Sequence, residues 1–191
     1  MKKISILFLA VITLSAFSVL STWKSDKPHS RLGFTITHLG IADISGSFKN
    51  FDVTVNSSKD DFSDATFELT AEVGSINTDV EMRDNHLKSA DFFEVEKYPT
   101  MTFKSTSLKN VGKNKFKLSG DLTLHGVTKP VTMDLLYRGT VENQMSKAPT
   151  AGFQLTGTLK RSDFGIGPKF PAPMLSDEVQ IKADGEFIKQ K

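Results

Sequence analysis

The chain of 191 residues contains no cysteine, a single tryptophan and two tyrosines. The absence of cysteine excludes disulfides, thiolate metal ligands and cysteine nucleophiles, so stability must come from packing and strand pairing. No Gly-x-Ser-x-Gly motif and no glycine-rich phosphate loop is present, which removes the usual parts of a serine hydrolase and of a nucleotide-binding enzyme. An excess of one charge is missing too. Without Lys2 and Lys3 the chain has 22 basic and 22 acidic residues, so nothing favours nucleic acid as a partner.

The first 21 residues have the pattern of an export signal. Lys2 and Lys3 form a charged start, residues 4–14 are apolar, and small residues follow. The pattern predicts a signal peptide over residues 1–21 and an exported, periplasmic protein whose single domain covers residues 22–191. A membrane anchor is the alternative, but a spanning helix needs ~20 apolar residues and serines interrupt this run early. We therefore expect no membrane-spanning segment after removal of the signal.

Short segments in which apolar and polar residues alternate recur along the rest of the chain. In residues 65–73 the apolar residues Ala65, Phe67, Leu69, Ala71 and Val73 fall on one side. Similar alternation marks residues 32–38, 44–55, 101–103, 116–124, 131–137, 153–159 and 179–187. The pattern predicts about eight antiparallel strands joined mostly by short turns, with a bulge near Lys49-Asn50 and a tight connection at His125-Gly126-Val127.

The number of strands favours a closed sheet. An open sheet would expose two edges to aggregation, whereas closure removes them and leaves room for one small ligand. We therefore predict an all-β fold, an eight-stranded antiparallel lipocalin-like barrel. A two-sheet sandwich without a cavity fits the same alternation and remains the alternative. The fifteen phenylalanines favour an apolar interior, because this side chain brings no polar atom that needs a buried partner.

One segment, residues 77–98, lacks the strand pattern. Thr78 and Glu81 have the spacing of a capping box, and the residues that follow predict a short helix over about 79–87. A second turn is expected over residues 90–93. We expect this helix to close one mouth of the barrel.

Charged residues near the predicted mouth are the candidate polar contacts. Arg83 and His86 share one helix face, where they would meet a polar or anionic head group; a plain surface helix is the alternative. Asp163 is expected to pair with Arg161 or to cap the local turn. The glycine- and proline-rich loop over residues 165–173 would then act as a lid, with Phe164, Phe170 and Met174 as its apolar contacts.

The four histidines are the place to look for an enzyme. His29, His38, His86 and His125 could bind a metal or act as general bases, but none has a spacing such as His-x-His or His-Glu-x-x-His. We expect His38 at the barrel mouth and His125 in a turn. The sequence predicts no metal and no catalytic residue, and a histidine-dependent enzyme is kept as a minor alternative.

Several blocks of residues resemble one known family across nearly the whole mature chain. These blocks are Trp23 with Asp26 and His29-Ser30; Phe34 and His38-Leu39-Gly40; Gly46-Ser47-Phe48; Arg83-Asp84-Asn85-His86-Leu87 with Phe92-Phe93 and Tyr98-Pro99; Phe103-Lys104-Ser105; Gly120-Asp121-Leu122-Thr123-Leu124-His125-Gly126; and Arg161-Ser162-Asp163-Phe164-Gly165. In order and spacing the chain resembles the YceI family. The resemblance implies an exported carrier or reservoir for a long polyisoprenoid lipid, such as a prenyl quinone or a polyprenyl phosphate, with its tail inside the barrel.

The predicted function is therefore the binding of a long apolar lipid, without any other cofactor. The residues expected to contact it are Phe34, Ile36, His38, Phe48, Phe67, Leu69, Arg83, His86, Phe103, Leu118, Leu122, Met133, Leu135 and Phe153. Most of them are assigned as contacts because the alternation along their strand places them on the side that faces the barrel interior. A barrel with a solid core that serves as an interaction or stress module is the alternative, and a homodimer paired through a sheet edge stays open.

Overall fold

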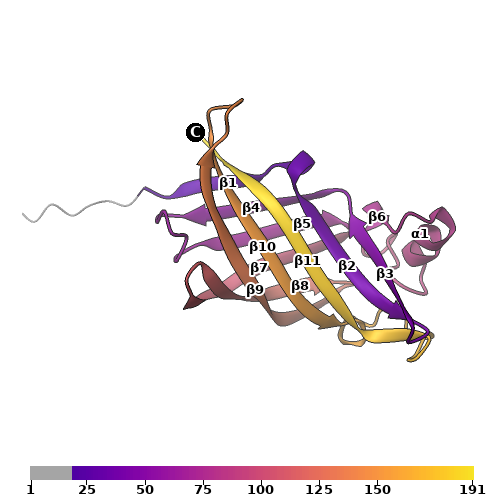
Figure 1. The fold of residues 1–191 in the computed structure, drawn as a ribbon. Helices are drawn as coiled ribbons and strands as arrows, with labels where there is room; N and C mark the ends of the chain where they lie inside the picture. The colour runs from indigo at the N-terminus through magenta and orange to yellow at the C-terminus, as the bar shows by residue number, and fades with distance from the viewer. Residues whose placement is uncertain (1–18) are drawn as a thin grey trace, which may run out of the picture.

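The computed structural model describes residues 19–191, so almost all of the predicted export signal, residues 1–21, lies outside the described residues. Eleven strands make up most of this part (Figure 1). They are β1 (Ser21–Ser25), β2 (Arg31–His38), β3 (Ala42–Phe48), β4 (Phe51–Ser57), β5 (Thr66–Glu72), β6 (Ile76–Asn77), β7 (Thr100–Gly112), β8 (Lys115–Leu124), β9 (Val127–Glu142), β10 (Pro149–Lys160) and β11 (Leu175–Lys189). One α-helix, α1 (Glu81–Lys88), and three 3-10 turns, η1 (Lys27–His29), η2 (Val73–Ser75) and η3 (Arg161–Phe164), complete the set.

The strands form one closed antiparallel sheet. The order is β1-β4-β5-β7-β8-β9-β10-β11-β2-β3-β6, and β1 also pairs with β11. Short interruptions separate β1 from β2, β3 from β4 and β5 from β6. When each of these pairs is counted as one long strand, the sheet is an eight-stranded barrel. The predicted lipocalin-like barrel is confirmed, and the closed sheet excludes the two-sheet sandwich.

The predicted alternation of inward-facing and outward-facing residues is also confirmed. In β8 the residues Phe116, Leu118, Gly120, Leu122 and Leu124 are buried, and none of the residues between them is. The turn that follows β8 consists of two residues, His125 and Gly126, with φ values of 52° and 73°. Two positive φ values are what a tight hairpin turn of type I′ requires, so His125 is the turn residue that the sequence predicts.

The end of the barrel opposite α1 is filled by an aromatic cluster centred on one side chain, Phe62. Phe62, in the loop between β4 and β5, is 1% exposed. Its ring centroid lies 5.2 Å from that of Trp23 and 5.0 Å from those of Tyr137 and Phe153. Figure 1 places this loop at the end that α1 does not cover. The ring therefore acts as a plug that closes this end.

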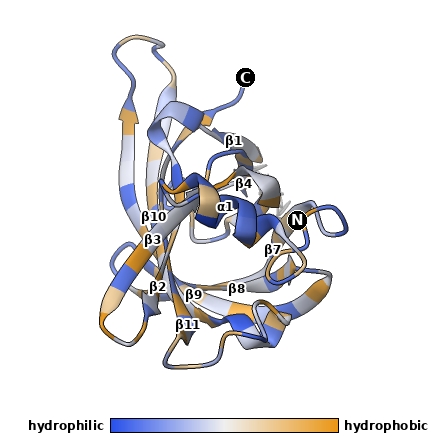
Figure 2. Ribbon diagram, turned by 90° about the vertical axis from the view of Figure 1, so that its right-hand side faces the viewer, coloured by the Kyte–Doolittle hydropathy of each residue, from blue (hydrophilic) through white to orange (hydrophobic). Residues whose placement is uncertain are grey.

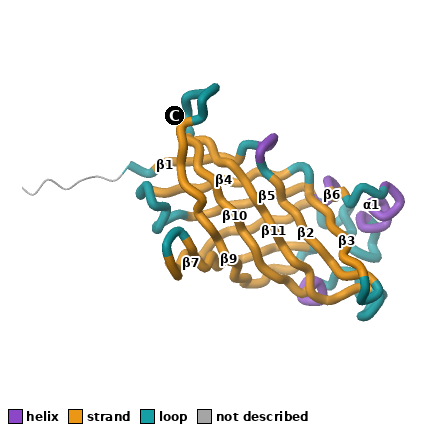
Figure 3. Tube along the Cα trace, in the orientation of Figure 1, coloured by secondary structure: helices purple, strands orange, loops and turns teal. Residues whose placement is uncertain are grey.

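The other end is covered by α1 and by loops (Figure 2). Figure 3 shows that strands form the wall of the barrel, while helices and loops gather at its ends. The helix begins at Glu81 after the N-cap residue Val80, close to the predicted range, and the predicted second turn follows it. No helix in the described part of the chain is long and apolar enough to cross a membrane.

The predicted capping box, however, is wrong. The hydroxyl of Thr78 donates a hydrogen bond of 2.6 Å to Oδ1 of Asp84 rather than capping the helix, and the backbone N–H of Thr78 donates to the same oxygen at 2.8 Å. Asp84 turns inward and is buried, so its carboxylate needs these donors. Because Val80 is the N-cap, Thr78 lies two residues before the cap position, and its hydroxyl binds the buried acid instead.

The plug generates a prediction about stability. Replacing Phe62 with alanine should lower the free energy of unfolding by about 3–5 kcal/mol, because it removes a buried ring and leaves a cavity. Urea denaturation measures this difference. Met145→Ala, at a side chain that is 95% exposed, is the control and should change stability by less than about 0.5 kcal/mol. Equal effects of the two variants would contradict the role of the plug.

A second prediction concerns Asp64 in the same loop. Partial burial acts to raise the pKa of this carboxyl, but hydrogen bonds from the hydroxyl of Ser57, 2.6 Å away, and from the hydroxyl and N–H of Ser58 lower it to about 2. A lowered pKa in the folded state stabilises the fold above the ordinary value near 4, and this contribution disappears as the pH falls toward 2.

Asp64→Asn should therefore cost about 1 kcal/mol at pH 6, a figure reduced for solvent screening of this exposed group. The difference from wild type should shrink below pH 4. Denaturant titrations from pH 6 to pH 2.5 test this, with Asp121→Asn as an exposed control on β8. A difference for Asp64→Asn that stays constant over this range would show that the carboxylate charge is not involved.

Candidate functional site

An apolar cavity of about 370 Å³ lies beneath α1, at the end of the barrel opposite the plug. We call it the mouth cavity. Its wall comes from β2, β3, the segment around α1, η3 and the loop that leads into β11. A volume of this size is typical of cavities that hold small organic ligands.

A second apolar cavity of about 150 Å³, here called the inner cavity, lies inside the barrel and is lined by residues of its strands. Leu159 and Ile181 line both cavities, so the two adjoin. Phe67 and Phe153, which also line the inner cavity, belong to the core cluster that contains the plug Phe62. The cavities therefore follow one another from the open mouth toward the sealed end.

All fourteen residues that the sequence predicts as ligand contacts line one of these two cavities. Six line the mouth cavity: Phe34, Ile36, His38, Phe48, Arg83 and His86. Eight line the inner cavity: Phe67, Leu69, Phe103, Leu118, Leu122, Met133, Leu135 and Phe153. The fold thus brings them together in two adjoining groups, while their contact with a lipid stays a prediction.

Glycines opposite aromatic rings give the interior its shape. A Cβ atom on Gly46 would overlap the ring of Phe34, and one on Gly120 would overlap the ring of Phe103. Both rings line a cavity, and both rest against a neighbouring strand at a position that has no side chain. Because the rings lie along the wall, they line the cavities without filling them.

Two basic side chains stand at the edge of the mouth cavity. Arg83 is held by Thr78, because its Nε donates to the hydroxyl oxygen at 2.7 Å and its Nη2 to the carbonyl oxygen at 2.6 Å. The ring of His86 meets the rings of Phe92 and Phe170 edge-on, at centroid distances of 5.0 and 5.6 Å. Both predicted mouth residues therefore lie where the sequence expects them, on α1 beside the opening.

Ionic contacts join α1 to the loop that faces it. Asp91 Oδ1 lies 2.7 Å from Nζ of Lys169, and its Oδ2 lies 3.3 Å from Nε2 of His86. The hydrogen bonds from Lys169 and His86 lower the pKa of the Asp91 carboxyl. Phe92 and Phe170 stack face to face at 4.8 Å beside these charges. The 77–98 segment and the 165–173 loop thus meet over the mouth.

Arg161 organises that loop. Its Nε donates to the carbonyl of Ser176 at 3.0 Å, its Nη1 to the carbonyls of Ile166 at 2.9 Å and Gly167 at 2.7 Å, and its Nη2 to the carbonyls of Phe170 and Leu175. The predicted pair with Asp163 is therefore wrong, because the buried guanidinium is taken up by loop carbonyls. The three expected lid contacts, Phe164, Phe170 and Met174, do line the mouth cavity.

The four histidines lie at three separate places. His38 and His86 line the mouth cavity, and Nδ1 of His125 donates to the carbonyl of Phe164 at 2.9 Å. Nε2 of His125 is buried without a hydrogen-bond partner and lies 3.7 Å from Oε2 of Glu94. His29 is on the outer surface, and the histidines therefore do not assemble a common centre.

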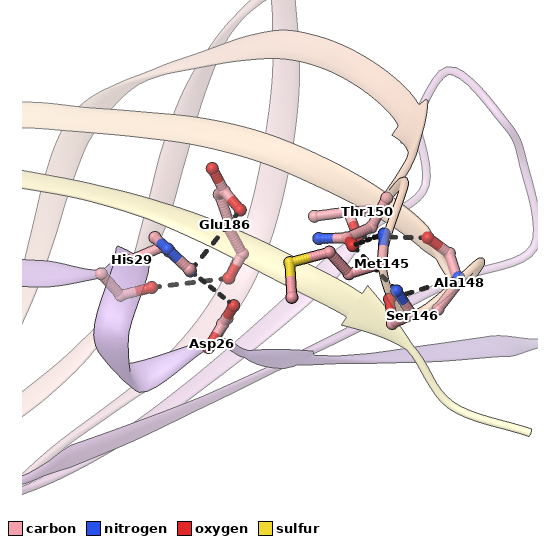
Figure 4. A network of polar contacts seen from close by, with 9 residues as sticks. Asp26, His29, Met145, Ser146, Ala148, Thr150 and Glu186 are labelled. Carbon is pink, nitrogen blue, oxygen red and sulfur yellow. Dashed lines mark hydrogen bonds and ion pairs between the residues drawn. The ribbon is translucent and has the colours of Figure 1, made fainter.

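Figure 4 shows the surroundings of His29, which lies between two carboxylates where η1 crosses β11. Its Nδ1 is 2.8 Å from Oδ2 of Asp26 and 4.0 Å from Oε2 of Glu186. The hydrogen bond to Asp26 and the charges of both acids raise the pKa of His29. None of these three residues lines either cavity. The cluster is therefore separate from the candidate ligand site.

Sequence reasoning missed part of the cavity wall. Leu159 and Ile181 fall on the apolar side of their alternating segments, so the sequence pattern already indicated that they face the interior. Arg161 and Ile166 gave no such signal, because their positions depend on the path of an irregular loop, and Leu175 opens β11 just before a shift in its register. Their contribution could be found only once the course of that loop was known.

Comparisons with known proteins agree with this architecture. The family model of the YceI-like domain matches residues 23–187. A UPF0312 protein of Staphylococcus aureus (strain N315) is 37% identical over 172 residues, which cover 88% of this chain and 98% of that protein.

Solved structures show the same fold. BcnA of Burkholderia cenocepacia has a TM-score of 0.74 and 25% identity and covers 85% of this chain and 98% of its own. The YCEI protein of Campylobacter jejuni has a TM-score of 0.73 and 31% identity, with 81% and 90% covered. A polyisoprenoid binding domain from Saccharophagus degradans has a TM-score of 0.67 but only 16% identity, with 90% and 100% covered, and shows likeness of fold alone.

The carbonyl cage around Arg161 generates a prediction. Arg161→Lys should destabilise the 165–173 loop and the start of β11. An ammonium group lacks the planar fork that reaches several carbonyls, so some of these carbonyls would be buried without a donor. We expect a loss of about 1–3 kcal/mol and faster amide hydrogen exchange in residues 165–176. Arg138→Lys, at an exposed arginine on β9 with an ion pair to Asp184, is the control. Unchanged exchange in the Arg161 variant would refute the role of the cage.

Proposed function

The chain belongs to the family of YceI-like domains, and on that premise we propose that it is an exported, periplasmic carrier or reservoir for a long polyisoprenoid lipid, such as a prenyl quinone or a polyprenyl phosphate. The observation that carries the proposal is the pair of adjoining apolar cavities, open toward α1 and ended by Phe62. A tail that enters at the mouth would extend along the barrel and stop at the plug.

The energetics of such a site are favourable. A tail that loses about 500 Å² of apolar surface to the cavities would gain about 12 kcal/mol at ~25 cal/mol per Å². Loss of overall motion and ordering of the tail would offset ~4–15 kcal/mol of this gain. With the lowest of these costs the balance is about 8 kcal/mol, which corresponds to affinity in the micromolar range and excludes the picomolar range. An apolar lining of this kind discriminates weakly between tails of similar shape.

Selectivity would come from the head group at the mouth. The guanidinium of Arg83 has five donor hydrogens, of which Thr78 takes up two, so the others remain available to an anionic or carbonyl-bearing group. His86 stands on the same helix and lines the same cavity. We propose that these two side chains contact the head group while the phenylalanines hold the tail.

Three observations support the binding role over its alternatives. The Saccharophagus domain, described as polyisoprenoid binding, has the same fold, although its low identity lends no support at the level of residues. His29, His125 and the two histidines of the mouth cavity lie at three separate places, an arrangement that favours binding over catalysis by a common histidine centre. The cavities also favour a ligand-binding barrel over a solid-core interaction or stress module.

Mass spectrometry of an organic extract of the protein, purified gently from the compartment to which it is exported, tests the proposal. We expect a polyprenyl species in a near-stoichiometric amount. An empty extract from folded protein would overturn the proposal and favour a solid-core interaction module or an enzyme.

A matched pair of variants tests where the lipid sits. Ala183 lines the inner cavity, whereas Gln180 on the same strand is exposed and lines neither cavity. Ala183→Phe should fill the inner cavity and reduce the amount of lipid retained at least several-fold without loss of folding, since a ring added to an empty apolar space has room. Gln180→Phe should retain lipid as wild type does. Full retention by a folded Ala183→Phe variant would place the tail elsewhere.

A further inference from the structure

Exposed apolar side chains gather at the edge of the mouth cavity. Leu39 and Ile41, in the turn between β2 and β3, are 52% and 85% exposed, and Met174, just before β11, is 46% exposed. The N–H of Leu39 donates to the carbonyl of Met174 at 3.0 Å, so the two loops lie side by side. We call Leu39, Ile41 and Met174 the mouth rim.

The mouth rim continues into the cavity. Met174 itself lines the mouth cavity, and so does His38, the residue before Leu39. Exposed apolar side chains also stand on the helix side of the mouth, since Met82 on α1 is 82% exposed and precedes Arg83, which lines the same cavity. In Figure 2, which looks at this end of the barrel, α1 and the β2–β3 turn face the same side. The cavity wall and the exposed rim thus form one apolar surface.

We propose that the mouth rim docks onto the surface of a phospholipid bilayer, where Leu39, Ile41 and Met174 enter the interface between head groups and acyl chains. This inference rests on the proposed function and extends it to the source of the cargo. A tail that left the bilayer through bulk water would expose all of its apolar surface. A tail that crosses from acyl chains to a docked rim and then to the mouth cavity stays in apolar surroundings throughout.

The charges at this end of the molecule specify the kind of docking. The elements that form this end carry Arg83, Lys88, Lys160 and Lys169 together with Asp43, Asp79, Glu81 and Asp91, so neither sign dominates. Docking by attraction to anionic lipids would need a cluster of basic residues. On a surface with mixed charges, insertion of apolar side chains supplies most of the free energy of membrane binding. With only a few side chains inserted, binding should be weak and reversible, which suits a carrier that must leave the bilayer again.

The opposite end of the barrel provides a matched control. Met145, in the turn between β9 and β10, is 95% exposed but lines neither cavity. Both Ile41 and Met145 are exposed, so an aspartate at either position should leave the fold intact. The two variants have the same added charge at different places on the molecule.

Flotation with vesicles of pure phosphatidylcholine tests the proposal. Wild type should float with the vesicles, and 0.5 M salt should leave the floated fraction nearly unchanged. Ile41→Asp should reduce vesicle binding on the order of tenfold, equivalent to about 1.4 kcal/mol, while Met145→Asp should bind as wild type does. Thermal melts check that both variants are folded.

Three results would overturn the proposal: no flotation of wild type, equal loss of binding in both variants, or binding that requires anionic lipid and disappears in salt. The lipid content of the same preparations is measured in parallel. Wild type that contains lipid but does not float would overturn only the docking and would favour a protein partner for the rim. Wild type that floats through Ile41 but contains no polyprenyl lipid would support the docking and overturn the proposed cargo.

Discussion

Everything that makes this molecule a container depends on the closure of its sheet, which β1 completes at the sealed end. This strand has five residues, and Trp23 at its centre pairs with Val55 of β4 on one side and with Lys189 of β11 on the other. Without these pairs the half of the barrel near Phe62 would open between β4 and β11, while at the mouth the sheet is closed by β2 with β11 and β3, and by β3 with β6. The indole of Trp23 is buried against Phe62, so the closing strand and the plug of the sealed end stabilise one another.

The closed sheet alone does not define a binding site, because a barrel has two ends. At one end an aromatic cluster around Phe62 fills the interior with side chains. At the other end the covering elements pack Phe92, Phe164 and Ile166 into a hydrophobic cluster, and they are joined by carbonyl hydrogen bonds of Arg161 and by the pair of Asp91 with Lys169. The ion pair of Asp91 with Lys169 lies at the surface and contributes little to stability, so the contact between the 77–98 segment and the 165–173 loop opens more easily than the packed core at the sealed end. The difference between the ends gives the cavity a single direction of entry.

The wall of the barrel was predictable from the sequence, because alternation is a local signal with a period of two. Alternation alone predicted that Phe67, Phe103 and Leu118 face the interior, and all three line the inner cavity. The ends were less predictable. The capping box at Thr78 failed because α1 begins later, after Val80, while Thr78 binds the buried Asp84; the pair of Arg161 with Asp163 failed because loop carbonyls surround the guanidinium. In both cases a contact set by the path of an irregular segment outweighed a local motif.

This division between wall and ends has a consequence for specificity. The wall offers apolar contact area, which selects tails by their length and width but not by their chemical groups. Chemical discrimination requires polar groups that a wrong ligand would leave unpaired, and in this chain such groups line the cavity near α1, where Arg83, His86 and Arg161 stand. Differences in cargo between members of this fold should therefore follow the residues of the 77–98 segment and the 161–175 loop. The strands can keep the same pattern of phenylalanine and glycine while the cargo changes.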